Sequence, residues 1–129
     1  MSKIAMKVVA TAAVMSILLT AATAQAAGAD PVKGGVIFNA KCGGCHSDVS
    51  GKNMVGPSLF GVYGRASGTA PGYTYSSGLK ASGIVWTSDN LTAWLTKPKA
   101  VVPGTKMSFA PPTTAEEKVD LIAYLKSKK

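Results

Sequence analysis

Metal-binding and nucleophilic side chains are scarce in this sequence, which has one histidine and two cysteines in 129 residues. A closed zinc site needs four ligands, and the chain offers only three cysteine or histidine candidates, all within residues 42–46. Low-complexity tracts, repeats and linkers are also missing, so we expect a single globular domain. No strand pattern of any length occurs, and the fold class is therefore predicted to be all-α.

The amino-terminal residues have the three-part layout of a secretory signal peptide over residues 1–26. Two lysines precede an uncharged run over residues 8–24, and small residues at Ala24 and Ala26 give a cleavage motif. A retained membrane anchor is the alternative, because about 17–25 apolar residues span a bilayer. Alanine and threonine make this run only mildly apolar. We therefore predict cleavage after Ala26, no stable membrane insertion afterwards, and a mature periplasmic domain over residues 27–129.

Both cysteines and the only histidine lie in one segment, Cys-Gly-Gly-Cys-His, at residues 42–46. A disulfide between Cys42 and Cys45 would close a very short loop and would constrain the unfolded chain little. A thioredoxin-like redox pair needs a strand before the motif, which this sequence lacks. A structural cysteine pair with a surface histidine is the remaining plain interpretation.

Covalent haem attachment explains the cysteine spacing and the histidine together. Each thiol adds to one vinyl group of the porphyrin, and two intervening residues let a helical turn span the two vinyl positions. The next residue, His46, is then carried beneath the iron, where a neutral imidazole nitrogen is a ligand. We predict one haem c per chain, bound through Cys42 and Cys45, with His46 as one axial ligand.

The opposite axial position of the iron is either open or filled by a second side chain. Three of the five methionines lie in the predicted signal peptide, which leaves Met54 and Met107. Met54 follows His46 by only eight residues, too few to round the haem edge, and is predicted to fill the core. Met107 follows a turn signal in VVPGTKMSFA and is predicted to be the second axial ligand, where a thioether raises the reduction potential.

Five segments, taken in order, resemble a class I cytochrome c of the mitochondrial and bacterial c2-like branch over residues 31–129: GGVIFNAKCGGCH, VGPSLFGVYGR, APGYTYSSGLKASGIVW, PGTKMSFA and DLIAYLKSK. The resemblance implies the cytochrome c fold, in which the N- and C-terminal helices cross and shorter helices and loops wrap round one haem. It also implies a soluble one-electron carrier without enzymatic activity, because both axial positions are filled.

The resemblance assigns roles to residues around the predicted haem. Pro57 matches the proline whose carbonyl accepts the ring N–H of His46, a contact that orients the ligand. Tyr75 and Trp86 match side chains that hydrogen-bond a buried propionate. Arg65 matches the arginine that helps to neutralise this propionate, since an unpaired buried carboxylate is costly.

One further residue matches the family at the haem edge, and two residues differ from it. Phe109 matches the aromatic residue at the exposed haem edge. Trp94 stands where mitochondrial relatives usually have a tyrosine that hydrogen-bonds the methionine sulfur, and whether its single N–H reaches Met107 is left open by the sequence. Leu79 replaces an asparagine and should make the pocket drier.

Local patterns predict where the helices begin and end. Asp30, followed by a proline, is a good helix start. Thr87 or Ser88 can cap a second helix, which must end before Pro98. Thr114, with a glutamate three residues later, predicts a capping box for the last helix.

The first and last helices are expected to pack against each other. Gly34 and Phe38 resemble the positions that cross Leu121 and Tyr124 in the family, where the glycine allows close approach. Helical spacing also predicts apolar faces formed by Val36, Ile37 and Ala40 on the first helix and by Val119, Ile122 and Leu125 on the last.

Two rival functions require an open iron. A peroxidase-like enzyme also needs a polar acid–base group, and the chain has no second histidine to supply one. A sensor that binds CO or NO is the other rival. Both need Met107 to leave the iron, so we predict an electron carrier.

The partners are predicted from charge. Lysine and arginine exceed aspartate and glutamate, 14 to 6, which favours the acidic faces of redox proteins and fast, short-lived encounter. Donors of this kind are a bc-type complex or a dehydrogenase, and acceptors are an oxidase, a reductase or a photosynthetic reaction centre. We expect a monomer that binds no nucleic acid. Basic residues predicted to flank the haem edge are Lys41, Lys97, Lys99 and Lys106, whereas Lys126, Lys128 and Lys129 are expected to be merely solvated.

Overall fold

The computed structural model describes residues 28–129, so the predicted signal peptide lies outside the described residues. The part described is helical and holds no strand, only an isolated bridge between Ala66 and Val85, which confirms the all-α prediction. Among these residues, no helix has the length and apolar character needed to cross a membrane. In chain order the helices are α1 (Pro31–Lys41), α2 (Ser77–Ala81), α3 (Ser88–Thr96), α4 (Pro98–Val101) and α5 (Ala115–Ser127).

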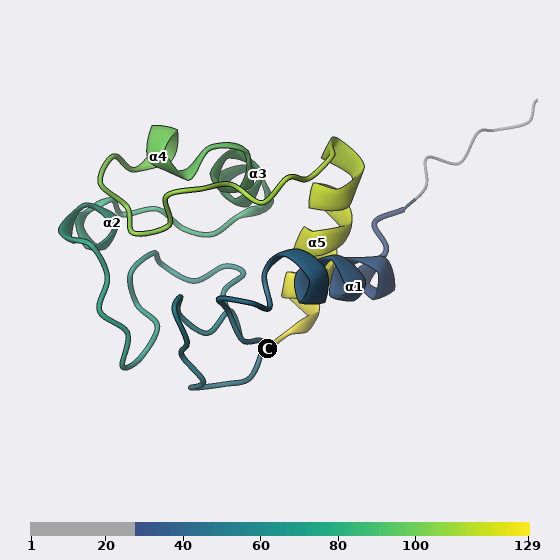
Figure 1. Cartoon of the computed structure of the whole chain (residues 1–129), viewed down its shortest axis with the longest axis horizontal. Helices are drawn as coiled ribbons and strands as arrows, with labels where there is room; N and C mark the ends of the chain where they lie inside the picture. Colours follow the sequence, from purple (N-terminus) through teal and green to yellow (C-terminus); the bar gives the residue numbers. More distant parts are fainter. Residues whose placement is uncertain (1–27) are drawn as a thin grey trace, which may run out of the picture.

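The N- and C-terminal helices cross at one end of the molecule, with α2 and α4 at the other end (Figure 1). The crossing is close because Gly34 has no side chain: a Cβ there would lie 2.0 Å from the carbonyl oxygen of Asp120. Next to it, the rings of Phe38 and Tyr124 are 5.5 Å apart. The predicted crossing of α1 and α5 is confirmed, and its position follows from the glycine.

Side-chain caps begin the three longest helices at the predicted residues. The Asp30 carboxylate accepts hydrogen bonds from the first backbone N–H groups of α1. The hydroxyl of Thr87, rather than that of Ser88, caps α3. Thr114 and Glu117 form the complete capping box of α5. Each cap satisfies N–H groups that would otherwise lack partners and contributes about 1 kcal/mol.

The predicted apolar faces of α1 and α5 are wrong in part. Val36 is 66% exposed and Val119 is 51% exposed, and Ala40 is exposed as well. The close approach at Gly34 fixes which face of α1 turns inward, and Phe38, one turn later, shares that face. Val36 lies two residues from each of them, roughly 200° round the helix, so it must point away.

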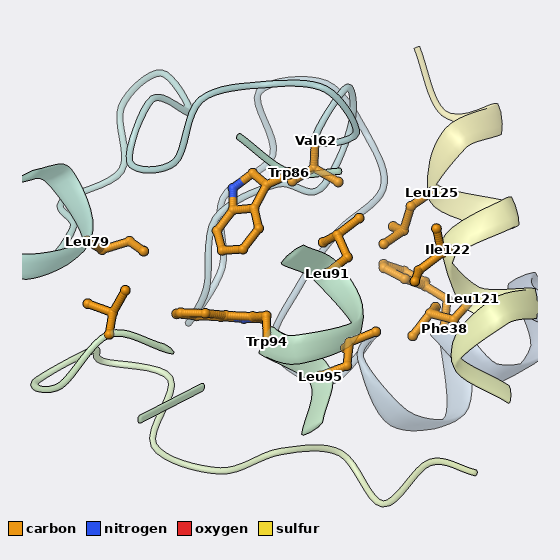
Figure 2. Packing of buried hydrophobic residues seen from close by; sticks show 11 residues of the cluster. Phe38, Val62, Leu79, Trp86, Leu91, Trp94, Leu95, Leu121, Ile122 and Leu125 are labelled. Carbon is orange, nitrogen blue, oxygen red and sulfur yellow. The ribbon is translucent and has the colours of Figure 1, made fainter. Parts of the chain in front are cut away.

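The hydrophobic core spans both ends of the molecule (Figure 2). Leu91 and Leu95 of α3 point toward α5, where Leu121 and Leu125 meet Phe38 of α1. Burying each such side chain contributes about 1.5–3 kcal/mol. Farther from α5, the rings of Trp86 and Trp94 pack edge to face at 5.1 Å, and Leu79 of α2 lies beyond them. Core residues near both ends, such as Leu79 and Leu121, face the same interior space.

Candidate functional site

The interior space is a cavity of about 920 Å³, near the upper end of the roughly 300–1,000 Å³ typical of cofactor sites. Several core residues, including Leu79, Leu91, Leu95 and Leu121, also line this cavity, so its walls are largely apolar. The structure brings every residue predicted for the site to this one cavity: Cys42, Cys45, His46, Pro57, Arg65, Tyr75, Trp86, Trp94, Met107 and Phe109.

The end of α1 places both cysteines and the histidine on the cavity wall. Cys42 caps the helix, and its N–H still bonds the carbonyl of Phe38 at 2.8 Å. The turn then continues, because the N–H groups of Cys45 and His46 both bond the Cys42 carbonyl, at 3.0 and 2.9 Å. Both cysteines are free and partly buried. Burial raises the pKa of the Cys42 thiol to about 11, with the nearby Lys41 charge opposing it, so this thiol is neutral at pH 7.

The imidazole of His46 is held in one tautomer. Its Nδ1 lies 2.8 Å from the carbonyl oxygen of Pro57. A carbonyl oxygen can only accept a hydrogen bond, so Nδ1 carries the proton and Nε2 keeps its lone pair. Burial lowers the pKa of His46, and this effect exceeds the opposing one of the Pro57 bond. The ring is therefore neutral near pH 7 and presents a nitrogen donor for a metal.

Met107 supplies a sulfur donor that is held by a hydrogen bond from Trp94. The indole Nε1 of Trp94, on α3, donates a hydrogen bond to the Met107 sulfur at 3.1 Å. The Met107 N–H bonds the hydroxyl of Thr105 at 3.3 Å, which helps to fix the turn before it. A thioether sulfur has two lone pairs, so one remains for a metal after the N–H bond is made. This answers the question about Trp94 that the sequence leaves open.

Met54 does not fill the core as predicted. Its side chain is 43% exposed, although it lines the cavity. The neighbouring Val55 is 76% exposed and Phe109 is 59% exposed, and both also line the cavity. We call Met54, Val55 and Phe109 the cavity rim. The rim is both apolar and exposed, because its three side chains are hydrocarbon or thioether groups that the rest of the described chain leaves partly uncovered.

Arg65 leaves a hydrogen-bond donor without a partner. Its Nη1 donates to the carbonyl of Phe60 at 3.0 Å, but its buried Nε has no partner among the described residues. An unsatisfied buried donor typically costs about 1–3 kcal/mol, and more when it is charged. An anionic group in the cavity would satisfy it. Tyr75 and Trp86 line the same cavity, as a site for a propionate requires.

These residues fit one covalently bound haem. The apolar walls suit the porphyrin, the two thiols lie beside the imidazole donor, and a thioether and a guanidinium supply the remaining contacts. No three histidine, cysteine, aspartate or glutamate side chains of residues 28–129 gather as a metal site of their own. The cavity is thus chemically suited to a macrocycle with an iron and acidic side arms.

Two lysines predicted to flank the haem edge are tied to other groups. Lys41 pairs with the Glu117 carboxylate at 2.8 Å and also donates to the carbonyl of Pro112 at 2.6 Å. Lys106 donates to the carbonyl of Thr74 at 2.5 Å. Both lysines still line the cavity, as residues that flank its edge would, and Lys106 is exposed. Lys41 connects α1 to α5 and to the loop before it, and Lys106 connects the Met107 segment to the loop that carries Thr74.

Lys128, expected to be merely solvated, is also engaged. It pairs with Asp48 at 2.8 Å, and the Tyr124 hydroxyl donates to the same carboxylate. These contacts lower the pKa of Asp48, mainly through the bond from Lys128. In contrast, Lys97, the N-cap residue of α4, and Lys99, within α4, are exposed.

Sequence reasoning missed three residues beside the predicted ligands. The Tyr73 hydroxyl donates to the carbonyl of Val55 at 2.9 Å, and the Asn53 amide donates to that of Pro71 at 2.9 Å. Both bonds join the loop beside His46 to the loop of residues 70–76. Gly56, next to Pro57, touches the imidazole of His46. The sequence signal for Gly56 was its place directly before Pro57, the residue expected to bond His46.

The geometry defines the class: a helical protein with a C-x-x-C-H segment and a facing methionine round one haem cavity. The sequence profile of the family described as Cytochrome c matches residues 31–129, and the chain belongs to this family. The family binds haem covalently through its cysteines, and its members are electron carriers. The predicted family and cofactor are thereby confirmed.

Individual relatives agree with this assignment. The chain is 47% identical over 100 residues to cytochrome c of Euglena viridis, covering 78% of this chain and 98% of that protein. It is 48% identical over 100 residues to cytochrome c2 of Rhodopila globiformis, covering 78% and 94%. The solved structure of cytochrome cH from Methylobacterium extorquens superposes with a TM-score of 0.70 at 44% identity, covering 77% and 99%. The predicted fold is therefore confirmed.

Proposed function

We propose that this chain is a periplasmic one-electron carrier whose single haem is attached through Cys42 and Cys45 and ligated by His46 and Met107. When bound, the haem supplies the one-electron redox couple. The proposal depends on one observation: a nitrogen donor, His46, and a sulfur donor, Met107, line the same cavity. Each is held by one hydrogen bond and still has a lone pair available for a metal.

The residues behind the donors set how strongly each one binds iron. Pro57 accepts the His46 N–H, which raises the basicity of Nε2 and favours the ferric state. Trp94 donates to the Met107 sulfur, which withdraws electron density and favours the ferrous state.

The charged end of the cavity is proposed to be held by Arg65 with Tyr75 and Trp86. The unpartnered Nε of Arg65 would donate to a propionate. The Tyr75 hydroxyl already accepts the N–H of Ala70 at 3.1 Å, so its own proton is left to donate. These three side chains would hold the carboxylate away from bulk water.

The iron is proposed to bind no substrate, because His46 and Met107 would both ligate it and leave no open position. The experiment is spectroscopic. Reduced protein should show the sharp low-spin bands of a c-type haem, and oxidised protein should show a methionine-to-iron charge-transfer band. If either is missing, or if the native reduced protein binds CO rapidly, the ligand assignment is wrong and a peroxidase or gas sensor gains support.

Export is proposed from residues 1–26. Mass spectrometry of protein recovered from the periplasm should give a chain that begins at Ala27 and carries the mass of one haem. A chain recovered only from membranes with its first residues intact would overturn this part of the proposal.

Partner encounter is proposed to combine long-range charge with apolar contact. The exposed Lys97 and Lys99 attract an acidic redox protein, and the cavity rim gives a small surface that releases quickly. A donor of the bc-type complex or dehydrogenase class, and an acceptor of the oxidase, reductase or reaction-centre class, would present such a face.

A further inference from the structure

Gly56 has a backbone conformation that does not require glycine. Seven glycines of the described chain have positive φ, from Gly51 to Gly104, and Gly56 is not among them. Any L-residue could therefore adopt its φ without strain. Its identity has to be explained by space.

The missing side chain leaves room for the His46 ring. A Cβ at Gly56 would lie 2.3 Å from Cε1, 2.6 Å from Nδ1 and 2.8 Å from Nε2 of His46. All three distances are below 3.0 Å, a separation that real Cβ atoms essentially never show. The nearly equal distances to three ring atoms place this Cβ over the face of the imidazole. An approach from the ring edge would leave both nitrogens about 1 Å farther than Cε1.

Gly56 is itself held in place, so it could not easily move to relieve such a clash. Its N–H bonds the carbonyl of Cys45 at 2.8 Å, and its carbonyl accepts the N–H of Met54 at 2.9 Å. The next residue, Pro57, accepts the bond from Nδ1. The imidazole is thus touched on its face by Gly56 and held at its edge by Pro57.

We propose that Gly56 is a positioning residue for the His46 ligand. The bare Cα face fixes the rotation of the imidazole about its bond to Cβ, and the Pro57 carbonyl fixes the direction of Nδ1. Together they aim the lone pair of Nε2 into the cavity. This inference rests on the proposed function, in which Nε2 ligates the haem iron.

A side chain at Gly56 must therefore turn or shift the ring. Turning it lengthens the bond from Nδ1 to Pro57 and makes Nε2 a weaker donor, which destabilises the ferric state. It also changes the angle of the imidazole plane to the porphyrin, which controls how unpaired spin is spread over the ferric haem.

Gly56→Ala in the holoprotein tests the proposal, with Gly28→Ala as the control for an added methyl group. Gly28 lies outside the cavity lining, lacks a positive φ, and has nothing within 4 Å of its Cβ position. Gly56→Ala should raise the midpoint potential and change the paramagnetic shifts of the haem methyl groups in ferric NMR spectra. Gly28→Ala should match the wild type in both. The inference is wrong if the haem-methyl shifts of Gly56→Ala equal those of the wild type.

A second measurement uses the wild-type protein, in case Gly56→Ala does not mature. One Cα hydrogen of Gly56 points along the missing Cβ direction, so the reduced protein should give a strong nuclear Overhauser effect between this hydrogen and Hε1 of His46. Its absence would overturn the inference. A wild type without a histidine-ligated low-spin haem would instead overturn the proposed function, so the two failures are distinguishable.

Discussion

The hydrogen bond from Trp94 to Met107 should raise the reduction potential, and Trp94→Phe should lower it. The indole Nε1 lies 3.1 Å from the sulfur. Ferric iron draws more density from its sulfur ligand than ferrous iron does, so the sulfur accepts the N–H less well in the oxidised protein. The bond therefore stabilises the reduced state more than the oxidised one.

The size of the effect follows from the strength of one hydrogen bond. A net contribution of about 0.5–1.5 kcal/mol is typical. For a one-electron couple, about 59 mV corresponds to a tenfold change in the equilibrium constant, or about 1.4 kcal/mol. The strength of this hydrogen bond can differ between the oxidised and the reduced protein by no more than its whole free energy. Trp94→Phe should therefore lower the midpoint potential by no more than roughly 20–60 mV.

Potentiometric titration followed by visible absorption measures this shift. Leu95→Ala is the matched control, because Leu95 lies on the same helix, lines the same cavity and is 7% exposed, as Trp94 is. Leu95→Ala should cost about 2–5 kcal/mol of stability but leave the potential close to that of the wild type. An unchanged or higher potential in Trp94→Phe, or an equal drop in Leu95→Ala, would refute this reasoning.

Three further predictions concern ligation, pH and partner encounter. Met107→Ala should keep its haem, lose potential and bind CO when reduced; an unchanged spectrum and no CO binding would mean that another side chain is the ligand. Glu117→Gln keeps a side-chain oxygen that can accept the Thr114 N–H of the capping box, but it removes the Lys41 pair, the main cause of the lowered pKa of Glu117. A lowered carboxyl pKa stabilises the folded state above the unfolded value of about 4.3, so this variant should melt below the wild type at pH 7. The gap should close as pH falls below about 4, and a gap that persists in acid would contradict the ion-pair origin. Lys99→Glu should slow electron transfer to an acidic partner at low salt more than Lys129→Glu does, and equal effects of both changes would indicate apolar recognition through the rim.

The sequence alone determined the features that depend on neighbours along the chain. The spacing of Cys42, Cys45 and His46 predicted a covalent haem, because two intervening residues and the next position suffice to place the reacting groups. Capping residues such as Asp30 and Thr114 predicted helix starts, because a cap bonds backbone groups only two or three residues away. Local chemistry was enough in each case.

The tertiary structure alone decided the contacts between segments that are distant in the chain. Val36 and Val119 fit an apolar helical pattern, but the close approach at Gly34 turned them outward, because a helix packs on the face that its tightest contact selects. Lys41 pairs with a carboxylate 76 residues away, which no local pattern could report. Whether the Trp94 N–H reached a sulfur depended on how α3 packs beside the Met107 loop, since no local pattern reports a 3.1 Å distance between side chains of separate segments.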